Sequence, residues 1–247
     1  MTSDVAGIRN YVSIRQDSRV SRLAGICGLV GAMLFFAGDM LFYGFVGSGR
    51  DFAAQVTARV MSESTMRLTA GGIIGPLAAG LCIIGFWHVY TNIHPSWANV
   101  GKVMMVAFFC LMVAGSAVHT LWTAKGFAIK FCTGQPGPCS EVLKATRSYW
   151  TLAYWMCAVP GYIGAGILLL LVAFGKSNCP RWTIVANPAF LALFGPFLTR
   201  VPAPLGAFLV GGFENLSIAV FFLVSIVTTW SRSGSFLPRR VINRSAT

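Results

Sequence analysis

Six apolar stretches, each about 20 residues long, constrain what this sequence can fold into. A helix of about 20 residues crosses a hydrocarbon core roughly 30 Å thick, because each residue adds about 1.5 Å. We therefore expect an all-α polytopic membrane protein, a bundle of about six transmembrane helices. The stretches lie near Leu23–Val46, Met66–Val89, Val100–Ala124, Tyr149–Phe174, Trp182–Thr199 and Leu205–Trp230.

The charge content agrees with membrane residence. Only 11% of the 247 residues are charged, where a soluble domain carries roughly a quarter. Six spans leave too little chain for a separate soluble domain. We expect a basic N-terminal segment at 1–22, the bundle at 23–230 and a basic tail at 231–247. The fifth stretch is the weakest, because prolines interrupt it at Pro188, Pro196, Pro202 and Pro204.

The distribution of basic residues predicts the orientation. With the N-terminus inside, eleven Lys and Arg fall on the inner side and eight on the outer side, and clusters of four flank the first and last spans. Basic residues near span ends face the cytoplasm, so we expect both termini there, which needs an even number of spans. The first apolar stretch is too long for the core of a signal peptide, about 7–15 residues, and we interpret it as a retained span. The chain is then multi-pass in a membrane of the plasma membrane or endoplasmic reticulum type.

Two features are expected on the outer side. Cys132 and Cys139 flank a Gly- and Pro-rich loop, which favours a short disulfide in an oxidising compartment, with two free thiols as the alternative. Residues 51–64 place Phe52, Val56 and Val60 at helical spacing, which predicts a short amphipathic helix on the membrane surface.

Two carboxylates lie within predicted spans. An Asp at the centre of a membrane helix costs about 2.5–3.5 kcal/mol on insertion, so such residues are candidate functional groups. Asp39 has Tyr43 four residues on, on the same helix face. Glu214 is followed by Asn215 and preceded by two glycines that permit a close approach. The alternative is that these groups only pair with a neighbour and hold helices together.

The predicted orientation places further polar and aromatic groups in the same outer half. His119 lies about five residues from the outer end of the third span, and Arg67 starts the second span, where it could pair with Asp39 or Glu63. We expect one outward-facing polar cavity, with Asp39, Glu214 and His119 as candidate catalytic residues. The candidate substrate-binding residues are Tyr43, Arg67, Trp122, Trp150, Tyr154 and Asn215. His88 and His94, at an inner end and in a loop, are interpreted as structural.

Several function classes are disfavoured. The sequence has no nucleotide-binding loop and no HExxH, GxSxG, CxxC or CxxCH motif, which argues against an ATPase, a zinc protease, a serine hydrolase and a covalent haem. We expect no cofactor and no metal. The net charge of +12 sits mostly at the two ends, where it indicates topology and attraction to anionic lipid rather than nucleic acid.

Three hypotheses stay open. The first is a membrane enzyme that isomerises or cyclises an isoprenoid- or sterol-like lipid by proton transfer at Asp39, Glu214 and His119. In size, span number and residue types the chain resembles small membrane sterol isomerases and membrane terpene cyclases, but it carries no motif of either family. The second is a transporter or channel coupled to protons or cations, and the third a binding or scaffold protein. The expected partners are membrane lipids and a hydrophobic small molecule.

Overall fold

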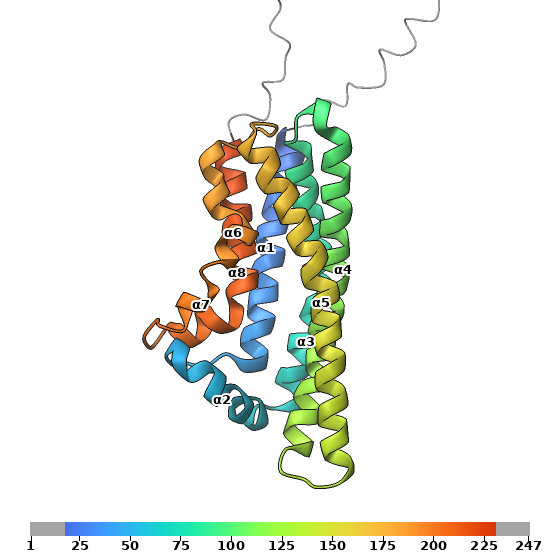
Figure 1. Cartoon of the computed structure of the whole chain (residues 1–247), viewed down its shortest axis with the longest axis vertical. Coiled ribbons are helices and arrows are strands. Elements are labelled where there is room, and N and C mark those ends of the chain that lie inside the picture. The colour runs from blue at the N-terminus through green and yellow to red at the C-terminus, as the bar shows by residue number, and fades with distance from the viewer. Residues whose placement is uncertain (1–17, 231–247) are drawn as a thin grey trace, which may run out of the picture.

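The computed structural model describes residues 18–230, and within them the chain forms helices and no β-strand. Five of the helices in this range are long and apolar enough to cross a membrane. Figure 1 shows these five helices side by side in one bundle. The prediction of an all-α polytopic membrane protein is confirmed. The five are α1 (Ser18–Tyr43), α3 (Thr65–Thr91), α4 (Ala98–Cys132), α5 (Pro138–Ala173) and α8 (Gly206–Thr229).

The fifth predicted span, Trp182–Thr199, is wrong as a continuous helix. In its place the chain forms the 3₁₀ helix η3 (Arg181–Ala186) and the short helices α6 (Pro188–Ala192) and α7 (Gly195–Leu198). Proline lacks a backbone N–H and fits the first turn of a helix, so Pro188 and Pro196 each lie in the first turn of a new short helix instead of continuing the previous one. Figure 1 shows α6 and α7 descending beside α8, so this broken segment still crosses the bundle.

The two ends of the described chain lie together. The Arg22 guanidinium, in the second turn of α1, donates a hydrogen bond of 2.6 Å to the carbonyl of Trp230, just after α8. We call this the terminal end and the opposite end the loop end. Ends on one side agree with the predicted even number of crossings, while their cytoplasmic location stays a prediction. The basic segments expected at 1–22 and 231–247 lie outside the described residues, apart from residues 18–22.

The predicted amphipathic helix is present as α2 (Gly49–Ser62) at the loop end. Ser48 and Asp51 form a capping box: the Ser48 hydroxyl accepts from the Asp51 N–H, and the Asp51 carboxylate accepts from the Ser48 N–H. Val60 is buried, and the apolar face of α2 packs on a small cluster formed by Phe42, Tyr43 and Leu68. The helix therefore covers the end of the bundle next to Asp39.

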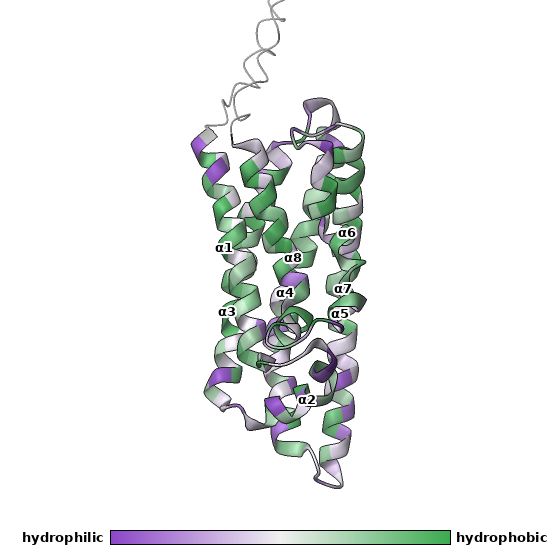
Figure 2. Cartoon of the chain, turned by 90° about the vertical axis from the view of Figure 1, so that its left-hand side faces the viewer, coloured by the Kyte–Doolittle hydropathy of each residue, from purple (hydrophilic) through white to green (hydrophobic). Residues whose placement is uncertain are grey.

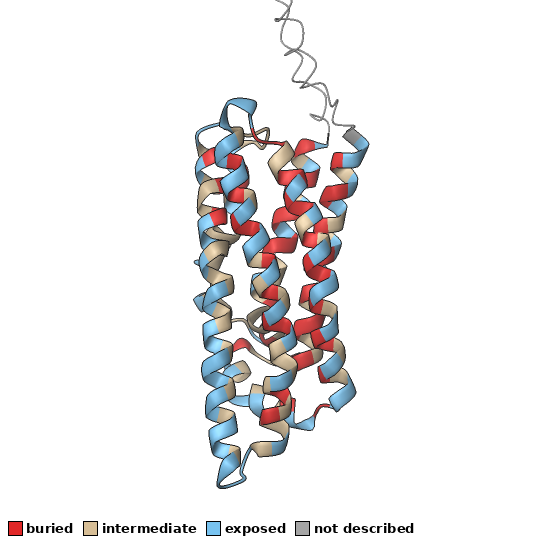
Figure 3. Ribbon diagram, turned by 90° about the vertical axis from the view of Figure 1, so that its right-hand side faces the viewer, coloured by how far each residue is buried: buried red, intermediate tan, exposed pale blue. Residues whose placement is uncertain are grey.

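The helical hairpin of α4 and α5 carries Cys132 and Cys139 near its tip. The expected disulfide is not formed: both residues are free cysteines, although the side chain of Cys132 contacts that of Cys139. Figure 3 shows that the residues around this tip are mostly exposed, while the buried residues line the facing sides of the helices.

The main core runs from the middle of the bundle toward the terminal end. Phe86 on α3 stacks on Phe108 of α4 with ring centroids 4.0 Å apart, and Phe222 of α8 packs on Phe86 at 5.0 Å. Gly28 of α1 faces Gly85 of α3, and a Cβ on either residue would overlap the backbone of the other and the Phe222 ring. These glycines let the two helices approach closely, as small residues do in membrane bundles. Figure 2 shows hydrophobic residues over most of the helix length and hydrophilic ones gathered near both ends.

Candidate functional site

Asp39 is the centre of a buried hydrogen-bond cluster near the loop end. Its residue is 6% exposed, and both carboxyl oxygens are engaged. The Tyr43 hydroxyl donates to Oδ1 at 2.8 Å, and the Asn215 amide donates to Oδ2 at 2.7 Å. Tyr43 lies one helical turn along α1 and Asn215 comes from α8, so the cluster ties these helices together. Both carboxyl oxygens of Asp39 are thus bonded within the protein.

Tyr43 gives the cluster two ways to hold a proton. Its hydroxyl lies within hydrogen-bond distance of Asp39 Oδ1 and, at 3.1 Å, of the Gly211 carbonyl, but a phenol has one hydrogen to donate. When Asp39 is ionised, Tyr43 donates to the carboxylate. When Asp39 is protonated, it can donate to Tyr43, which then donates to Gly211. The cluster can thus accept or release a proton without moving a heavy atom.

His119 of α4 stands behind Asp39, at a longer distance. Its Nε2 lies 3.7 Å from Asp39 Oδ1, beyond hydrogen-bond range, and the residue is 6% exposed. The ring packs against Phe35 at 4.7 Å and Phe42 at 5.8 Å between centroids. His119 is therefore largely shielded from the surface.

Glu214 has the opposite environment. It is exposed on α8, one residue before Asn215, and Tyr154 of α5 donates a 2.6 Å hydrogen bond to its Oε1. Its second oxygen, Oε2, has no hydrogen-bond partner among residues 18–230. Glu214 also lies close enough to Asp39 for the two carboxyls to interact electrostatically. The two carboxyls therefore differ: one is enclosed and fully bonded, and the other is open on one oxygen.

The predicted aromatic residues do form a wall, but a cation of the chain already occupies it. Trp122 meets Trp150 edge to face at 5.8 Å, and Tyr154 stacks on Trp150 at 5.5 Å. Lys125 Nζ lies 4.1 Å from the centroid of the Trp122 ring and 3.8 Å from that of Trp150. Lys125 was not among the predicted site residues. Its three-residue offset from Trp122, which places both on one helix face, could have predicted this contact.

Arg67 is not part of the Asp39 cluster. Of the two partners considered, the structure selects Glu63, whose Oε2 lies 2.5 Å from the Arg67 guanidinium. Arg67 also donates to the carbonyls of Met40 and Gly44, at 2.8 and 3.5 Å, where α1 ends. Arg67 thus satisfies free carbonyls at the C-terminus of α1, a position that favours a cation.

A second buried polar cluster lies at the terminal end. His88 of α3 is 1% exposed; its Nδ1 is 3.0 Å from the Ser21 hydroxyl, and its Nε2 is 3.3 Å from the Ser225 hydroxyl and 3.5 Å from that of Thr229. The interpretation of His88 as structural fits these contacts, since they join α1, α3 and α8. Its three hydroxyl partners could not be predicted from spacing, because they lie at least 67 residues away along the chain.

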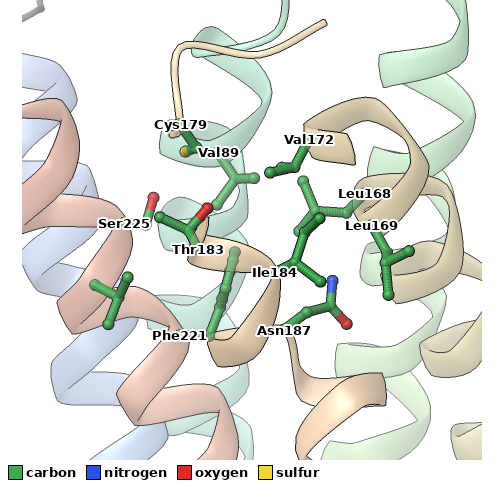
Figure 4. A pocket seen from close by; sticks show the side chains of 11 residues that line it. Val89, Leu168, Leu169, Val172, Cys179, Thr183, Ile184, Asn187, Phe221 and Ser225 are labelled. Carbon is green, nitrogen blue, oxygen red and sulfur yellow. The ribbon is translucent and has the colours of Figure 1, made fainter. Parts of the chain in front are cut away.

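A small cavity adjoins the His88 cluster (Figure 4). Its volume is about 10 Å³, at the lower limit for one water molecule. Ser225, Thr183 and Asn187 supply its polar lining among mainly apolar side chains. Asn187 also caps α6 and donates to the Ala165 carbonyl of α5 at 3.0 Å, so the cavity marks the joint where the broken segment meets the bundle.

The described residues hold no group of three or more His, Cys, Asp or Glu side chains that could bind a metal ion. The arrangement at the loop end can instead hold and transfer protons. It consists of the exposed carboxyl of Glu214 with one free oxygen, the Tyr154 phenol bonded to its other oxygen, and the buried carboxyl of Asp39. Asp39 is linked to this pair through Asn215, the residue that follows Glu214 on α8.

Residues 15–232 match a family of unknown function (DUF6796). This match covers most of the chain, which therefore belongs to that family. No curated protein and no solved structure matches the sequence.

Proposed function

We propose that this member of the family is an integral membrane enzyme that isomerises an isoprenoid- or sterol-like lipid by proton transfer at Glu214. One observation carries the proposal: Glu214 is exposed within a membrane-crossing helix and keeps Oε2 free of any partner in the described chain. A carboxyl in such a place is costly unless it meets water, a partner or a ligand. A lipid that enters sideways from the bilayer would reach it.

The proposed reaction is a shift of a carbon–carbon double bond. Protonated Glu214 gives its proton from Oε2 to one alkene carbon, which leaves a cation on the adjacent carbon. The carboxylate then takes a proton from the carbon on the far side of the cation, a new double bond forms, and the enzyme regains its proton. The Tyr154 hydrogen bond to Oε1 stabilises the carboxylate formed in between.

Asp39 acts in this scheme as a positioning residue. It holds Asn215, the neighbour of Glu214, through the 2.7 Å hydrogen bond and so fixes the register of α8 at the site. His119 packs beside Asp39, with its Nε2 3.7 Å from Asp39 Oδ1.

The geometry favours isomerisation over cyclisation. A cyclase would need free aromatic faces to stabilise successive carbocations. Here Lys125 lies over both Trp122 and Trp150, and Tyr154 stacks on Trp150. A second cation would be repelled by Lys125, so these faces are poorly suited to that task.

The test uses the purified full chain in proteoliposomes made with a total lipid extract, in D₂O buffer. Proton return to carbon places deuterium at a position that does not exchange back, so wild type should label one lipid species, read by mass spectrometry. Glu214→Gln should abolish labelling and Asp39→Asn should reduce it. Glu141→Gln, the same change at an exposed site in the first turn of α5, should label like wild type. A folded Glu214→Gln protein that still labels the lipid would overturn the proposal.

A transporter coupled to protons or cations is the second candidate, favoured by the broken segment from η3 to α7. Discontinuous helices at membrane depth are a recurring feature of transporter binding sites. The transporter hypothesis predicts no lipid labelling. It predicts proton-driven uptake of a small solute into proteoliposomes, which Glu214→Gln should abolish. If neither activity is found, the scaffold hypothesis remains. We place the chain in a plasma membrane or endoplasmic reticulum membrane, with both termini cytoplasmic, on the charge distribution alone.

A further inference from the structure

A wide groove opens at the loop end, where α1 ends, α3 begins and α2 crosses between them. Its volume is about 870 Å³, within the range of sites that bind small molecules. Helix α2 and the start of α3 line it with Gln55, Arg59, Ser62 and Arg67, which we call the polar wall. The end of α1, the turn after it and α8 line it with Leu41, Phe45 and Phe208, which we call the apolar wall. We call this the loop-end groove.

The polar wall has an excess of positive charge. Glu63 forms ion pairs with Arg59 at 2.7 Å and with Arg67 at 2.5 Å, so one carboxylate faces two guanidinium groups. Lys130 adds a third cation nearby, because its ammonium group donates to the backbone carbonyls of Met61 and Glu63. The Glu63 side chain is 9% exposed, against 38% for Arg59 and 28% for Arg67. The cations, rather than the carboxylate, are what the groove presents.

Arg59 has hydrogen-bond donors that no described residue uses. It meets Glu63 through Nε, and its two terminal nitrogens have no hydrogen-bond partner among the described residues. A guanidinium in this state offers a planar pair of N–H groups that suits a phosphate. Arg67 is less free, since its nitrogens already contact Glu63, Met40 and Gly44.

From this juxtaposition we propose that the loop-end groove binds one membrane lipid with an anionic phosphate headgroup. The phosphate meets Arg59 and Arg67 on the polar wall, and the first part of the acyl chain lies along Leu41, Phe45 and Phe208. A free anion would use only the first wall, and a neutral lipid only the second. The position fits as well, because α2 lies at the end of the membrane-crossing helices, where headgroups are found.

This inference is independent of the proposed function. The groove lining does not include Asp39, Tyr154 or Glu214. Glu214→Gln should therefore bind the lipid as wild type does. A failure to find lipid binding in the groove would not change the outcome expected in the deuterium-labelling test of the proposed function.

The experiment measures lipid binding to the full chain in a neutral detergent by native mass spectrometry. The probes are dioleoyl phosphatidic acid, dioleoyl phosphatidylcholine and inorganic phosphate. We expect one phosphatidic acid to bind about tenfold or more tightly than phosphatidylcholine, the size expected for a charge-assisted hydrogen bond. Equal binding of the two lipids would overturn the proposal. So would displacement of phosphatidic acid by millimolar phosphate, which would make this a small-anion site.

Two variants and two matched controls locate the binding. Arg59→Gln removes the free guanidinium and should weaken phosphatidic acid binding about tenfold, whereas Arg50→Gln makes the same change on α2 outside the groove lining and should not. Ala58→Trp fills the groove without altering charge and should weaken binding similarly, whereas Ala53→Trp, at an exposed α2 position outside the lining, should not. Wild-type binding in both Arg59→Gln and Ala58→Trp would refute the assignment. Each variant must elute and unfold like wild type.

Discussion

Tyr43→Phe tests the Asp39 cluster by removing a single oxygen atom. The Tyr43 ring packs on Trp122 at 5.1 Å and on Phe52 at 5.7 Å, and phenylalanine keeps both contacts. The lost group is the hydroxyl that donates to Asp39 Oδ1. No other hydrogen bond reaches that oxygen within residues 18–230, and His119 Nε2 lies 3.7 Å away. The variant therefore reports on the hydrogen bond and not on packing.

The expected cost follows from the burial of the acceptor. Leaving a buried acceptor without its donor costs about 1–3 kcal/mol, while hydrogen bonds between membrane helices contribute about 0.6 kcal/mol on average and 1.7 kcal/mol at most. Asp39 is 6% exposed and keeps only Asn215 as a donor. We expect the free energy of unfolding to fall by about 1–2 kcal/mol, roughly a 5–30-fold change in the unfolding equilibrium.

The measurement is reversible unfolding in mixed micelles of a mild detergent and sodium dodecyl sulfate, followed by tryptophan fluorescence. Tyr149→Phe is the matched control, because Tyr149 is 60% exposed and its side chain makes no hydrogen bond in the described chain. Its effect should stay below about 0.5 kcal/mol. A stabilising role of the Tyr43–Asp39 hydrogen bond would be refuted if Tyr43→Phe unfolds like wild type, or if Tyr149→Phe is equally destabilised.

Two further predictions concern packing and redox state. Gly85→Ala should lower the free energy of unfolding by about 1–3 kcal/mol, because the new Cβ would overlap Gly28 and the Phe222 ring. Gly80→Ala should be neutral or stabilising, because no atom lies within 4 Å of its Cβ. Thermal unfolding of both variants is the measurement, and equal midpoints would contradict the prediction. Mild oxidation should join Cys132 to Cys139, since their side chains already touch, and remove two alkylatable thiols by mass spectrometry; an unchanged thiol count would exclude the pairing.

Much of the fold could be predicted because membrane helices form from local sequence. In the bilayer a backbone must bond to itself, so a long apolar run becomes a helix wherever it packs, even with one internal proline such as Pro76 in α3 or Pro160 in α5. This explains why four predicted spans match α1, α3, α4 and α5, and a fifth matches α8. The stretch Trp182–Thr199 has the composition of a span, but Pro188 and Pro196 divide it into short helices. Composition alone does not predict that break.

The candidate site was predictable only in part. Tyr43 lies one turn from Asp39 on the same helix, so their contact follows from helix geometry. The partnership of Asn215 with Asp39 spans 176 residues, and that of Tyr154 with Glu214 spans 60. Neither spacing carries a periodic signal, because the register between two helices is set by how their side chains interlock.

By itself, then, the sequence determined what a single helix determines: which five long segments are apolar enough to cross the membrane and which polar residues they carry. Only the tertiary structure decided what each polar group meets. It enclosed Asp39 and exposed Glu214, paired Arg67 with Glu63 instead of Asp39, and buried His88 among three hydroxyls. The physical reason is that burial and partnership belong to interfaces between helices, and an interface exists only after the helices have packed.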